Sequence, residues 1–365
     1  MKGPWKLMPH TEAKHKIYRA YLDAWYPILI KKYGVITYAE GFAGCGIYTG
    51  GEPGSPVIAL QRLLQRRHQF PDLRRARFLL VEKELRNATL LADQLAKVLK
   101  TDGPVWNYDD GVLQVILRTG LCEDTLPGLL DDAKSWGSPI LAIFDTFGGG
   151  VPVSLLQRIA RNRSSEVIYT VLPQHFVRFS SQGRGDEVFA NNHWRDVTTM
   201  PDFAKREFIA EEFANAVSAA GFHHVLRFNL GTSRGELLNL LFGTRSEAGV
   251  AKFKDAMWKA DPIAGAGFFD PRDPDQQFLP MEHEPRLEPL ERVLLQQLLA
   301  APGQRMTVDE LRHFTELSTI FKRSHVTPSL TRLCEHQLIY QPRGPLRLGN
   351  TIVTGIDQQD LFVTG

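Results

Sequence analysis

The amino end of the chain carries apolar residues at the spacing of a helix. Between residues 10 and 33 these positions are Ile17, Tyr21, Ala24, Trp25, Ile28 and Leu29. Steps of three and four residues place such side chains on one face of a helix. The first expected element is therefore an amphipathic helix.

Short apolar runs then alternate with helix-like stretches. The runs are VITYAEGF from Val35, RFLLVEK from Arg77, VWNYDD from Val105, PILAIFDTF from Pro139 and EVIYTVL from Glu166. Stretches such as ELRNATLLADQLAKVLK and PVSLLQRIARNR lie between them. Nearly continuous apolar strands are typical of a parallel sheet with helices on both faces. The pattern predicts five parallel strands in an α/β fold.

This alternation stops after the fifth run. QHFVRFSSQGRGDEVFANNHWRDV is polar, aromatic and contains glycine, which predicts an inserted loop or lid near residues 174–200. A long helix is expected in FAKREFIAEEFANAVSAAGF, followed by HHVLRFNL and LLNLLFGT with the short turn GTSRGE between them. Strands joined by so short a turn pair antiparallel. The expected sheet thus has five parallel strands and a terminal hairpin, Rossmann-like in its parallel part.

The remainder of the chain predicts a second domain. Residues 261–285 are rich in Pro, Gly and Asp, which indicates a linker after a first domain over residues 1–260. Helices are expected in LERVLLQQLLA, TVDELRHFTE and VTPSLTRLCEHQLIY, and a small hairpin in QPRGPLRLGNTIVT. Thr307 and Glu310 have the spacing of a capping box. Three helices and a hairpin predict a winged helix-turn-helix-like domain over residues 286–365.

Composition changes this picture little. A chain of 365 residues is longer than one core usually serves, while 43% hydrophobic and 23% charged residues are ordinary for a globular protein. A net charge of +2 excludes no partner. There is no run of about 18 apolar residues to span a bilayer and no apolar signal-peptide core. Three scattered cysteines without CxxC spacing argue against disulfides and zinc. We expect a cytoplasmic protein without a metal.

The first expected strand ends in an acid, Glu40, and a glycine-rich turn, EGFAGCG. Dinucleotides bind such turns through a pyrophosphate, which the acid would repel. S-adenosylmethionine has no phosphate and presents an ammonium and a sulfonium. There is no GK[ST] for a P-loop. The turn favours S-adenosylmethionine, with an NAD-dependent dehydrogenase as a weak alternative. The turn residues assigned to the cofactor are Glu40, Gly41, Phe42, Gly44 and Gly46.

Further acids follow the next expected strands. Glu82 closes FLLVE, where a carboxylate can accept both ribose hydroxyls. Asp109 and Asp110, in NYDDG, are expected to hydrogen-bond the adenine amino group, and Asp145, in FDTFGGG, is expected beside the donated methyl. All four positions are assigned to the carboxyl ends of strands, the edge where open α/β sheets bind ligands. Taken singly, each acid is better explained as a helix cap. Only the joint pattern predicts S-adenosylmethionine.

Four stretches together resemble the bacterial three-Cys-motif partner protein (TcmP) family: KHKIYRAYLDAWYPIL, YAEGFAGCGIYTGGEPGSP, IFDTFGGG and FKDAMWKADP. The resemblance covers most of the chain. It implies a class I S-adenosylmethionine-dependent methyltransferase, its seven-stranded sheet closed by the hairpin, followed by a winged-helix domain. It also implies cofactor contacts by Glu40, Gly44 and Gly46, ribose binding by Glu82, and residues 145–148 beside the reactive methyl.

Two residues depart from that family's pattern. Asp-Thr-Phe-Gly stands where Asp-Pro-Phe/Tyr-Gly is usual, and Glu40 stands where aspartate is usual. Proline in this motif fixes a carbonyl that accepts from a target amine, and the next aromatic stacks on the base. Thr146 weakens the case for methylation of an adenine amino group, whereas Phe147 still offers a stacking face. The expected catalytic residues are Asp145, which orients or deprotonates the acceptor, and Phe147.

The hypothesis from these patterns is a methyltransferase whose acceptor is a nucleic acid base. DNA or RNA would bind the basic residues around the presumed recognition helix, Lys322, Arg323 and Arg332, and those of the wing, Arg343 and Arg347. His175 and Arg178, in LPQHFVRF, are further expected acceptor contacts. The alternative is a non-catalytic scaffold with a methyltransferase fold that docks a three-Cys-motif protein. Thr146 favours this alternative modestly.

Overall fold

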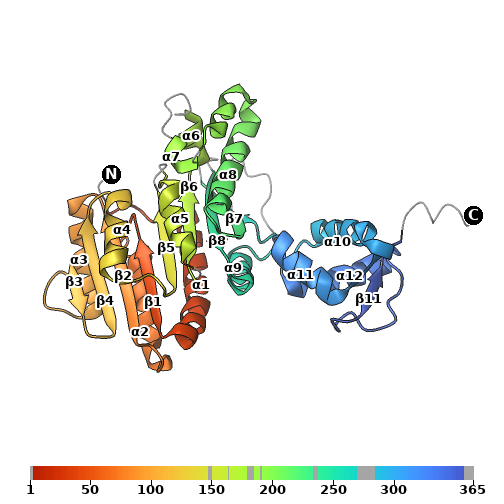
Figure 1. Cartoon of the computed structure of the whole chain (residues 1–365), viewed down its shortest axis with the longest axis horizontal. Coiled ribbons are helices and arrows are strands. Elements are labelled where there is room, and N and C mark those ends of the chain that lie inside the picture. The colour runs from red at the N-terminus through yellow and green to blue at the C-terminus, as the bar shows by residue number, and fades with distance from the viewer. Residues whose placement is uncertain are drawn as a thin grey trace, which may run out of the picture. The chain divides into compact units, whose positions relative to one another are not determined.

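The structure is a computed structural model that describes residues 3–146, 150–162, 164–178, 185–189, 191–232, 237–268 and 284–356 (Figure 1). The chain divides into two units. The first comprises Met1–Ala260 with Gly267–Leu279, and the second comprises Asp261–Ala266 with Pro280–Gly365. The first six residues of the expected linker therefore belong to the second unit.

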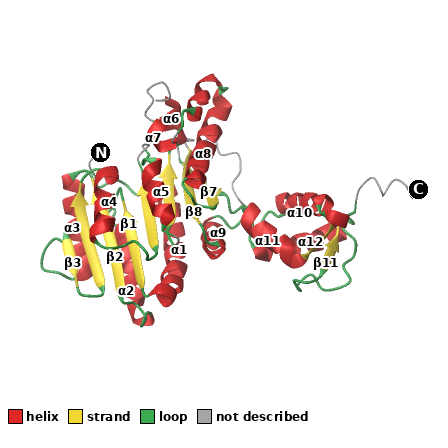
Figure 2. Cartoon of the chain, in the orientation of Figure 1, coloured by secondary structure: helices red, strands yellow, loops and turns green. Residues whose placement is uncertain are grey.

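A large, mostly parallel sheet forms the middle layer of the first unit (Figure 2). Its order among the described residues is β3-β4-β2-β1-β5-β6-β8-β7-β9. The strands are β1 (Val35–Glu40), β2 (Arg75–Glu82), β3 (Asn107–Asp109), β4 (Leu113–Thr119), β5 (Ile140–Asp145), β6 (Glu166–Val171), β7 (His224–Gly231), β8 (Leu237–Thr244) and β9 (Gly267–Phe268). From β4 to β6 the five strands are parallel, and β8 pairs antiparallel with both β6 and β7. The predicted number of parallel strands, five, and the terminal hairpin are confirmed, although the run VWNYDD is not one of the five. Among the described residues β3 and β9 extend the expected seven-stranded sheet to nine strands.

The third parallel strand differs from the predicted one. The run VWNYDD supplies only β3, which pairs antiparallel with β4 at the sheet edge. The third parallel strand is β4, which was not predicted because only one face is buried, at Leu113, Val115 and Leu117. Asp110 accepts the backbone N–H groups of Val112 (2.9 Å) and Leu113 (2.6 Å), which closes the turn between β3 and β4.

Helices cover both faces of the sheet (Figure 1). α1 contacts α2 and α9, and α2 contacts α3, so these four form one layer, while α4, α5 and α8 bury their apolar faces in the core on the other side. The helix predicted from about residue 10 is α1, which ends where Gly34 adopts φ +67°. The helices are α1 (Pro9–Tyr33), α2 (Ser55–Arg66), η1 (Arg67–Gln69), α3 (Leu85–Leu99), α4 (Cys122–Asp132), α5 (Val153–Arg161), α6 (Pro173–Arg178), α7 (Asp186–Phe189), η3 (His193–Thr199), α8 (Asp202–Ala219) and α9 (Glu247–Ala260).

The segment predicted as an inserted loop or lid is helical where it is described. Phe176 of α6, Phe189 of α7 and Trp194 of η3 are buried. Phe176 and Phe189 contact the ring of Phe213 on α8, with ring centroids 4.9 Å and 4.6 Å away, and Phe189 stacks on Trp194. The expectation of a loop was wrong for these residues, because their aromatic side chains form a core with α8.

The second unit contains three longer helices and two paired strands. Its elements are α10 (Glu288–Ala300), η4 (Pro302–Gln304), β10 (Arg305–Thr307), α11 (Val308–Ser318), η5 (Arg323–His325), α12 (Val326–Glu335) and β11 (Ile352–Thr354). The predicted capping box is confirmed, since Thr307 and Glu310 each bind the other's backbone N–H. The segment predicted as a hairpin supplies β11, whose partner β10 precedes α11.

No helix in the described ranges is both long enough and apolar enough to cross a membrane.

Candidate functional site

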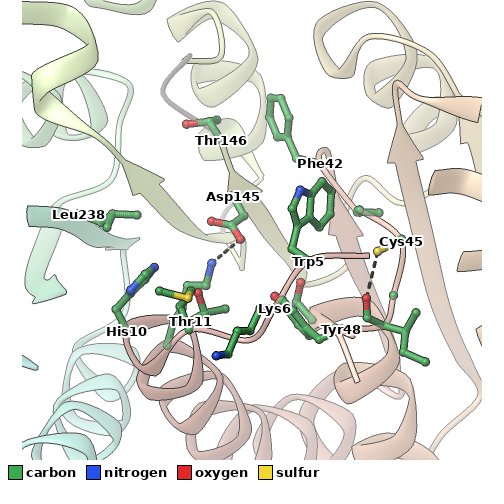
Figure 3. A pocket seen from close by; sticks show the side chains of 18 of the residues that line it. Trp5, Lys6, His10, Thr11, Phe42, Cys45, Tyr48, Asp145, Thr146 and Leu238 are labelled. Atoms are coloured by element: carbon green, nitrogen blue, oxygen red, sulfur yellow. Dashed lines mark hydrogen bonds and ion pairs between the residues drawn. The ribbon is translucent and has the colours of Figure 1, made fainter. Parts of the chain in front are cut away.

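A cavity of about 350 Å³ lies at the carboxyl edge of the sheet in the first unit (Figure 3). Its walls include the turn after β1 and the end of β5, which are neighbouring strands. The chain passes from β1 to β2 on one side, whereas β5 lies on the other side of β1. Open α/β sheets bind ligands at such a switch point, in cavities of about 300–1,000 Å³. Position and size fit a small ligand.

The glycine-rich turn after β1 forms one wall of this cavity. Gly44 and Gly46 have φ of +64° and +70°, where side chains are strained. A Cβ on Gly44 would meet only Trp5, at 3.9 Å, so the backbone is open toward the cavity. A Cβ on Gly46 would lie 2.6 Å from Cδ1 of Leu91 on α3. Of the turn residues assigned to the cofactor, Phe42, Gly44 and Gly46 line the cavity.

Glu40 lies beneath the turn and not in the cavity wall. Its carboxylate is fully buried and accepts hydrogen bonds from the hydroxyls of Tyr38 (2.7 Å) and Ser55 (2.5 Å). Burial raises the pKa of Glu40 to about 8, against the effect of these two hydrogen bonds. Glu40 therefore ties the end of β1 to the start of α2. The expectation of a carboxylate presented directly to a cationic ligand was wrong in this geometry.

We expect Glu40→Gln to remove one source of pH-dependent stability. The pKa of this carboxyl is raised from 4.5 to about 8 in the folded state, so its contribution to the free energy of unfolding is fully present below about pH 4.5. The contribution is lost as the pH rises toward 8, by at most about 1.4 kcal/mol per pH unit. Urea unfolding of both proteins between about pH 5 and about pH 8 should show that the free energy of unfolding of the wild type falls relative to that of the variant as the pH rises. A difference independent of pH contradicts this assignment.

Gly41 and Glu82 support the turn from behind. A Cβ on Gly41 would lie 2.2 Å from Sγ of Cys122, so no side chain fits there. The carboxylate of Glu82 accepts the backbone N–H groups of Gly44 (2.8 Å) and Glu84 (2.9 Å) and the amide of Asn87 (3.3 Å). Glu82 is thus beside the turn at the predicted strand end, although it does not line the cavity. Its ribose contact stays a prediction.

Residues 5–14, before and at the start of α1, contribute a further wall of the cavity. The sequence did not predict this contribution. The carbonyl of Trp5 accepts the backbone N–H of Thr49 at 2.8 Å, and the Trp5 side chain lines the cavity beside Phe42 (Figure 3). Lys6, His10 and Lys14 also line it. His10 and Lys14 are four residues apart at the start of α1, and this spacing is the signal that could have been used, because it places both side chains on one face of the helix. Lys6 lies before the helix.

Asp145, the predicted catalytic acid, forms an ion pair with Lys14 of α1. The side chains are 22% and 7% exposed, respectively, and both line the cavity. The neighbouring His15 is buried, which together with Lys14 lowers its pKa to about 3, so His15 is neutral. The end of β5 therefore presents a carboxylate with a cation already beside it.

Thr146, where the resemblance to the TcmP family leads us to expect proline, also lines the cavity. Its hydroxyl donates a hydrogen bond to the carbonyl of Thr170 on β6 at 3.0 Å, which joins the ends of two neighbouring strands. Phe147 lies outside the described residues, so its predicted stacking role has no structural test.

Asp109 and Asp110 lie at the opposite edge of the sheet. They form the turn between β3 and β4, where Asp109 pairs with Arg75 (2.5 Å) and Asp110 with Arg67 (2.9 Å). Arg75 begins β2, whose far end is Glu82. The predicted adenine contact is wrong, because this segment is a hairpin turn at the amino ends of the parallel strands.

His175 and Arg178, the predicted acceptor contacts, lie on α6 and outside the wall of the cavity. His175 is half-buried and its ring meets that of Phe176 edge-on, with centroids 5.6 Å apart. Arg178 is exposed. The structure does not bring these two residues to Asp145, and their role stays a prediction.

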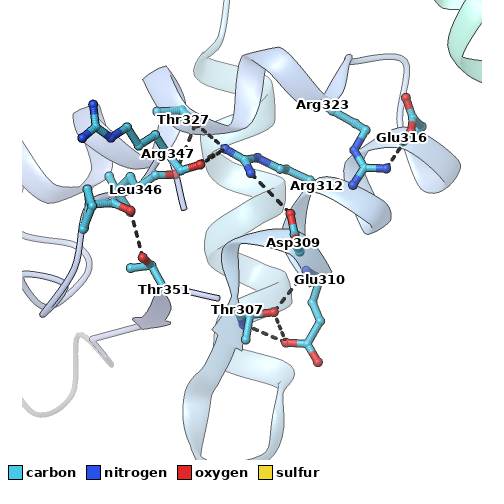
Figure 4. Close-up of polar contacts among 11 residues, drawn as sticks. Thr307, Asp309, Glu310, Arg312, Glu316, Arg323, Thr327, Leu346, Arg347 and Thr351 are labelled. Atoms are coloured by element: carbon cyan, nitrogen blue, oxygen red, sulfur yellow. Dashed lines mark hydrogen bonds and ion pairs between the residues drawn. The ribbon is translucent and has the colours of Figure 1, made fainter. Parts of the chain in front are cut away.

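Several basic residues of the second unit are held by polar contacts within that unit, such as Arg312 and Arg323 (Figure 4). Arg323 pairs with Glu316 at 3.3 Å, and Arg332 pairs with Glu291 at 3.4 Å. Lys322 is half-buried just before η5. Two of the three nucleic acid contacts predicted around the recognition helix are therefore matched by acids of their own unit.

Three arginines of the second unit are exposed in a different place. Arg305, Arg343 and Arg347 have no side-chain hydrogen bond or ion pair within the part of the chain that the structure describes. Arg305 and Arg343 line one hollow beside β10 and β11, and Arg347 lines another beside α12. The unpaired positive charge lies near the paired strands.

Within the described ranges, no three His, Cys, Asp or Glu side chains come together as a metal site. No protein-family model and no curated protein matches the chain.

Solved structures show distant similarity. EvdMO1 shares 14% identity at a TM-score of 0.34, over 64% of this chain and 42% of its own length, so the chain spans less than half of that protein. An O-methyltransferase from Bacillus cereus, in complex with SAH, shares 12% identity at a TM-score of 0.31, over 62% and 80%. The O-methyltransferase TomG from Streptomyces achromogenes, involved in tomaymycin synthesis and in complex with SAM, shares 14% identity at a TM-score of 0.31. The match covers 62% of this chain and 78% of that protein.

Proposed function

We propose that the first unit binds S-adenosylmethionine and transfers its methyl group. The observation that supports this is the cavity at the switch point between β1 and β5, with the open backbone of Gly44 in one wall and Asp145 in another. Backbone open at a glycine turn suits a ligand that must approach closely. The resemblance to the TcmP family points to the same cofactor.

The residues around the cavity fit such a ligand. Its walls combine apolar side chains, such as Phe42, Leu172 and Leu238, with the charges of Lys14 and Asp145. When bound, S-adenosylmethionine supplies a methyl carbon activated by its sulfonium. The protein then has chiefly to align the acceptor with that carbon. Because Lys14 donates to Oδ2 of Asp145, we expect Asp145 to bind and position a ligand through Oδ1 and not to remove a proton.

Isothermal titration calorimetry with S-adenosylmethionine and S-adenosylhomocysteine tests this proposal. We expect dissociation constants in the micromolar range, and loss of heat with Gly44→Val, whose β-branched side chain is strained at a positive φ. Gly51→Val is the matched control, because Gly51 also has a positive φ but does not line the cavity. If the wild type binds neither compound, the non-catalytic scaffold that docks a three-Cys-motif protein becomes the better account.

For the second unit, we propose a winged-helix-like domain that binds DNA or RNA as the acceptor. The unpaired arginines Arg305, Arg343 and Arg347 support a contact near β10 and β11. Phosphate contacts by arginine make affinity fall with salt. Fluorescence anisotropy with duplex and single-stranded oligonucleotides should show salt-dependent binding that Arg343→Ala weakens more than Arg323→Ala. No binding at low ionic strength removes nucleic acid as the acceptor.

A further inference from the structure

The Lys14–Asp145 ion pair joins elements far apart in the sequence. Lys14 lies on α1 and Asp145 ends β5, 131 positions later, yet their side chains meet in the wall of the same cavity. Lys14 is 7% exposed and Asp145 is 22% exposed. Glu40 lies behind the turn, so among the described residues that line the cavity the carboxylate is that of Asp145, and the ammonium groups are those of Lys14 and the exposed Lys6.

Lys14 and Asp145 can each form further hydrogen bonds beyond the one that joins them. Among the described residues, Lys14 Nζ bonds only to Oδ2 of Asp145, and Oδ1 of Asp145 has no hydrogen bond. A lysine ammonium has three donors and a carboxylate accepts through both oxygens. Two N–H groups of Lys14 and one oxygen of Asp145 are therefore available to a ligand beside them.

We infer that this ion pair is the subsite for a zwitterionic α-amino-acid group. The ligand's ammonium would donate to Asp145 and its carboxylate would accept from Lys14, so each charge meets its opposite. A ligand end that carries a single charge would be attracted by one member of the Lys14–Asp145 pair and repelled by the other. Charge-assisted hydrogen bonds of this kind are among the stronger polar contacts. The inference rests on the proposed function, because the methionine end of S-adenosylmethionine is such a group.

The other explanation is that the pair only anchors α1 to the sheet. A buried ion pair is weak support for that explanation, since replacing both partners by apolar residues is often neutral. Ligand selectivity separates the two accounts. A purely structural pair would not distinguish ligands that differ only in the amino-acid group.

The test is calorimetry on the full chain with three probes: S-adenosylhomocysteine, decarboxylated S-adenosylhomocysteine and 5′-methylthioadenosine. All three share the adenosine and the thioether sulfur, and the last two lack the carboxylate or the whole amino-acid group. We expect the wild type to bind S-adenosylhomocysteine about 10- to 100-fold more tightly than methylthioadenosine. This ratio of dissociation constants corresponds to the free energy of one or two hydrogen bonds between charged groups.

Substitutions of Lys14 and Asp145 then test which charge of the ligand each residue binds. Lys14→Met should weaken S-adenosylhomocysteine to nearly the affinity of its decarboxylated form and leave methylthioadenosine unchanged. Asp145→Asn should weaken both ligands that carry the ammonium. Lys16→Met is the matched control, because Lys16 lies on the same helix with a side chain 61% exposed. Lys14→Arg keeps the charge and should retain most of the selectivity if Lys14→Met does not fold.

Equal wild-type affinity for S-adenosylhomocysteine and methylthioadenosine overturns this inference and leaves the proposed function standing. Absence of binding by all three probes overturns the proposed function itself. Selectivity that survives Lys14→Met assigns the carboxylate to another cation, such as Lys6, and also overturns the inference.

Discussion

Replacing Phe213 by alanine is expected to lower the free energy of unfolding by about 3–5 kcal/mol. Phe213 is fully buried on α8, with its ring centroid 4.6 Å from that of Phe189, 4.9 Å from Phe176 and 5.6 Å from Tyr169. Its removal leaves a cavity among rings contributed by α6, α7 and β6, which cannot close without moving several elements. Urea unfolding followed by circular dichroism measures the change.

The same helix provides the control for this prediction. Phe203 is 89% exposed on α8, so Phe203→Ala changes the same residue type without opening a cavity. Its effect should stay within about 0.5 kcal/mol, as for other surface substitutions. Comparable losses for the two variants would show that α8 does not depend on the aromatic cluster.

Gly46→Ala is expected to destabilise the first unit by about 2–4 kcal/mol and to weaken S-adenosylhomocysteine binding. The new Cβ would be strained at a φ of +70° and would lie 2.6 Å from Cδ1 of Leu91 and 3.2 Å from Cγ2 of Val57. Relief of that overlap displaces the buried Leu91 side chain or shifts the turn, whose backbone lines the cavity. Thermal unfolding and calorimetry together measure both effects.

Gly51→Ala separates strain from overlap. Gly51 has φ +90° and no atom within 4 Å of its Cβ position, so its substitution introduces backbone strain alone. We expect a loss of about 1–2 kcal/mol without a change in ligand affinity. Equal effects of the two substitutions on binding would mean that packing at Gly46 does not shape the cavity.

The sequence predicted those parts of the site that depend on local rules. A continuous apolar run ending in Glu40, followed by glycines, specified a strand and a turn with positive φ, and the turn lies where it was expected. Asp145 was likewise placed correctly at the end of a strand. The turn's support could not be predicted, because the burial of Glu40 depends on Tyr38 and Ser55 closing over it.

Misplaced residues show where local patterns fail. Asp109 and Asp110 follow an apolar run, yet the run belongs to an edge hairpin whose partner, β4, is buried on one face only. Whether an acid ends a parallel strand or closes a hairpin depends on which strands pair. Pairing is a long-range property that the periodicity of either strand does not contain.

The sequence by itself determined four of the five parallel strands, β1, β2, β5 and β6, the antiparallel terminal hairpin, the glycine turn and the capping box at Thr307, because each follows from periodicity or from backbone conformation within a few residues. Only the tertiary structure decided that Lys14 meets Asp145 and that the N-terminal segment walls the cavity. The reason is that contacts across 131 positions depend on how α1 packs beside the end of β5, which no local pattern encodes.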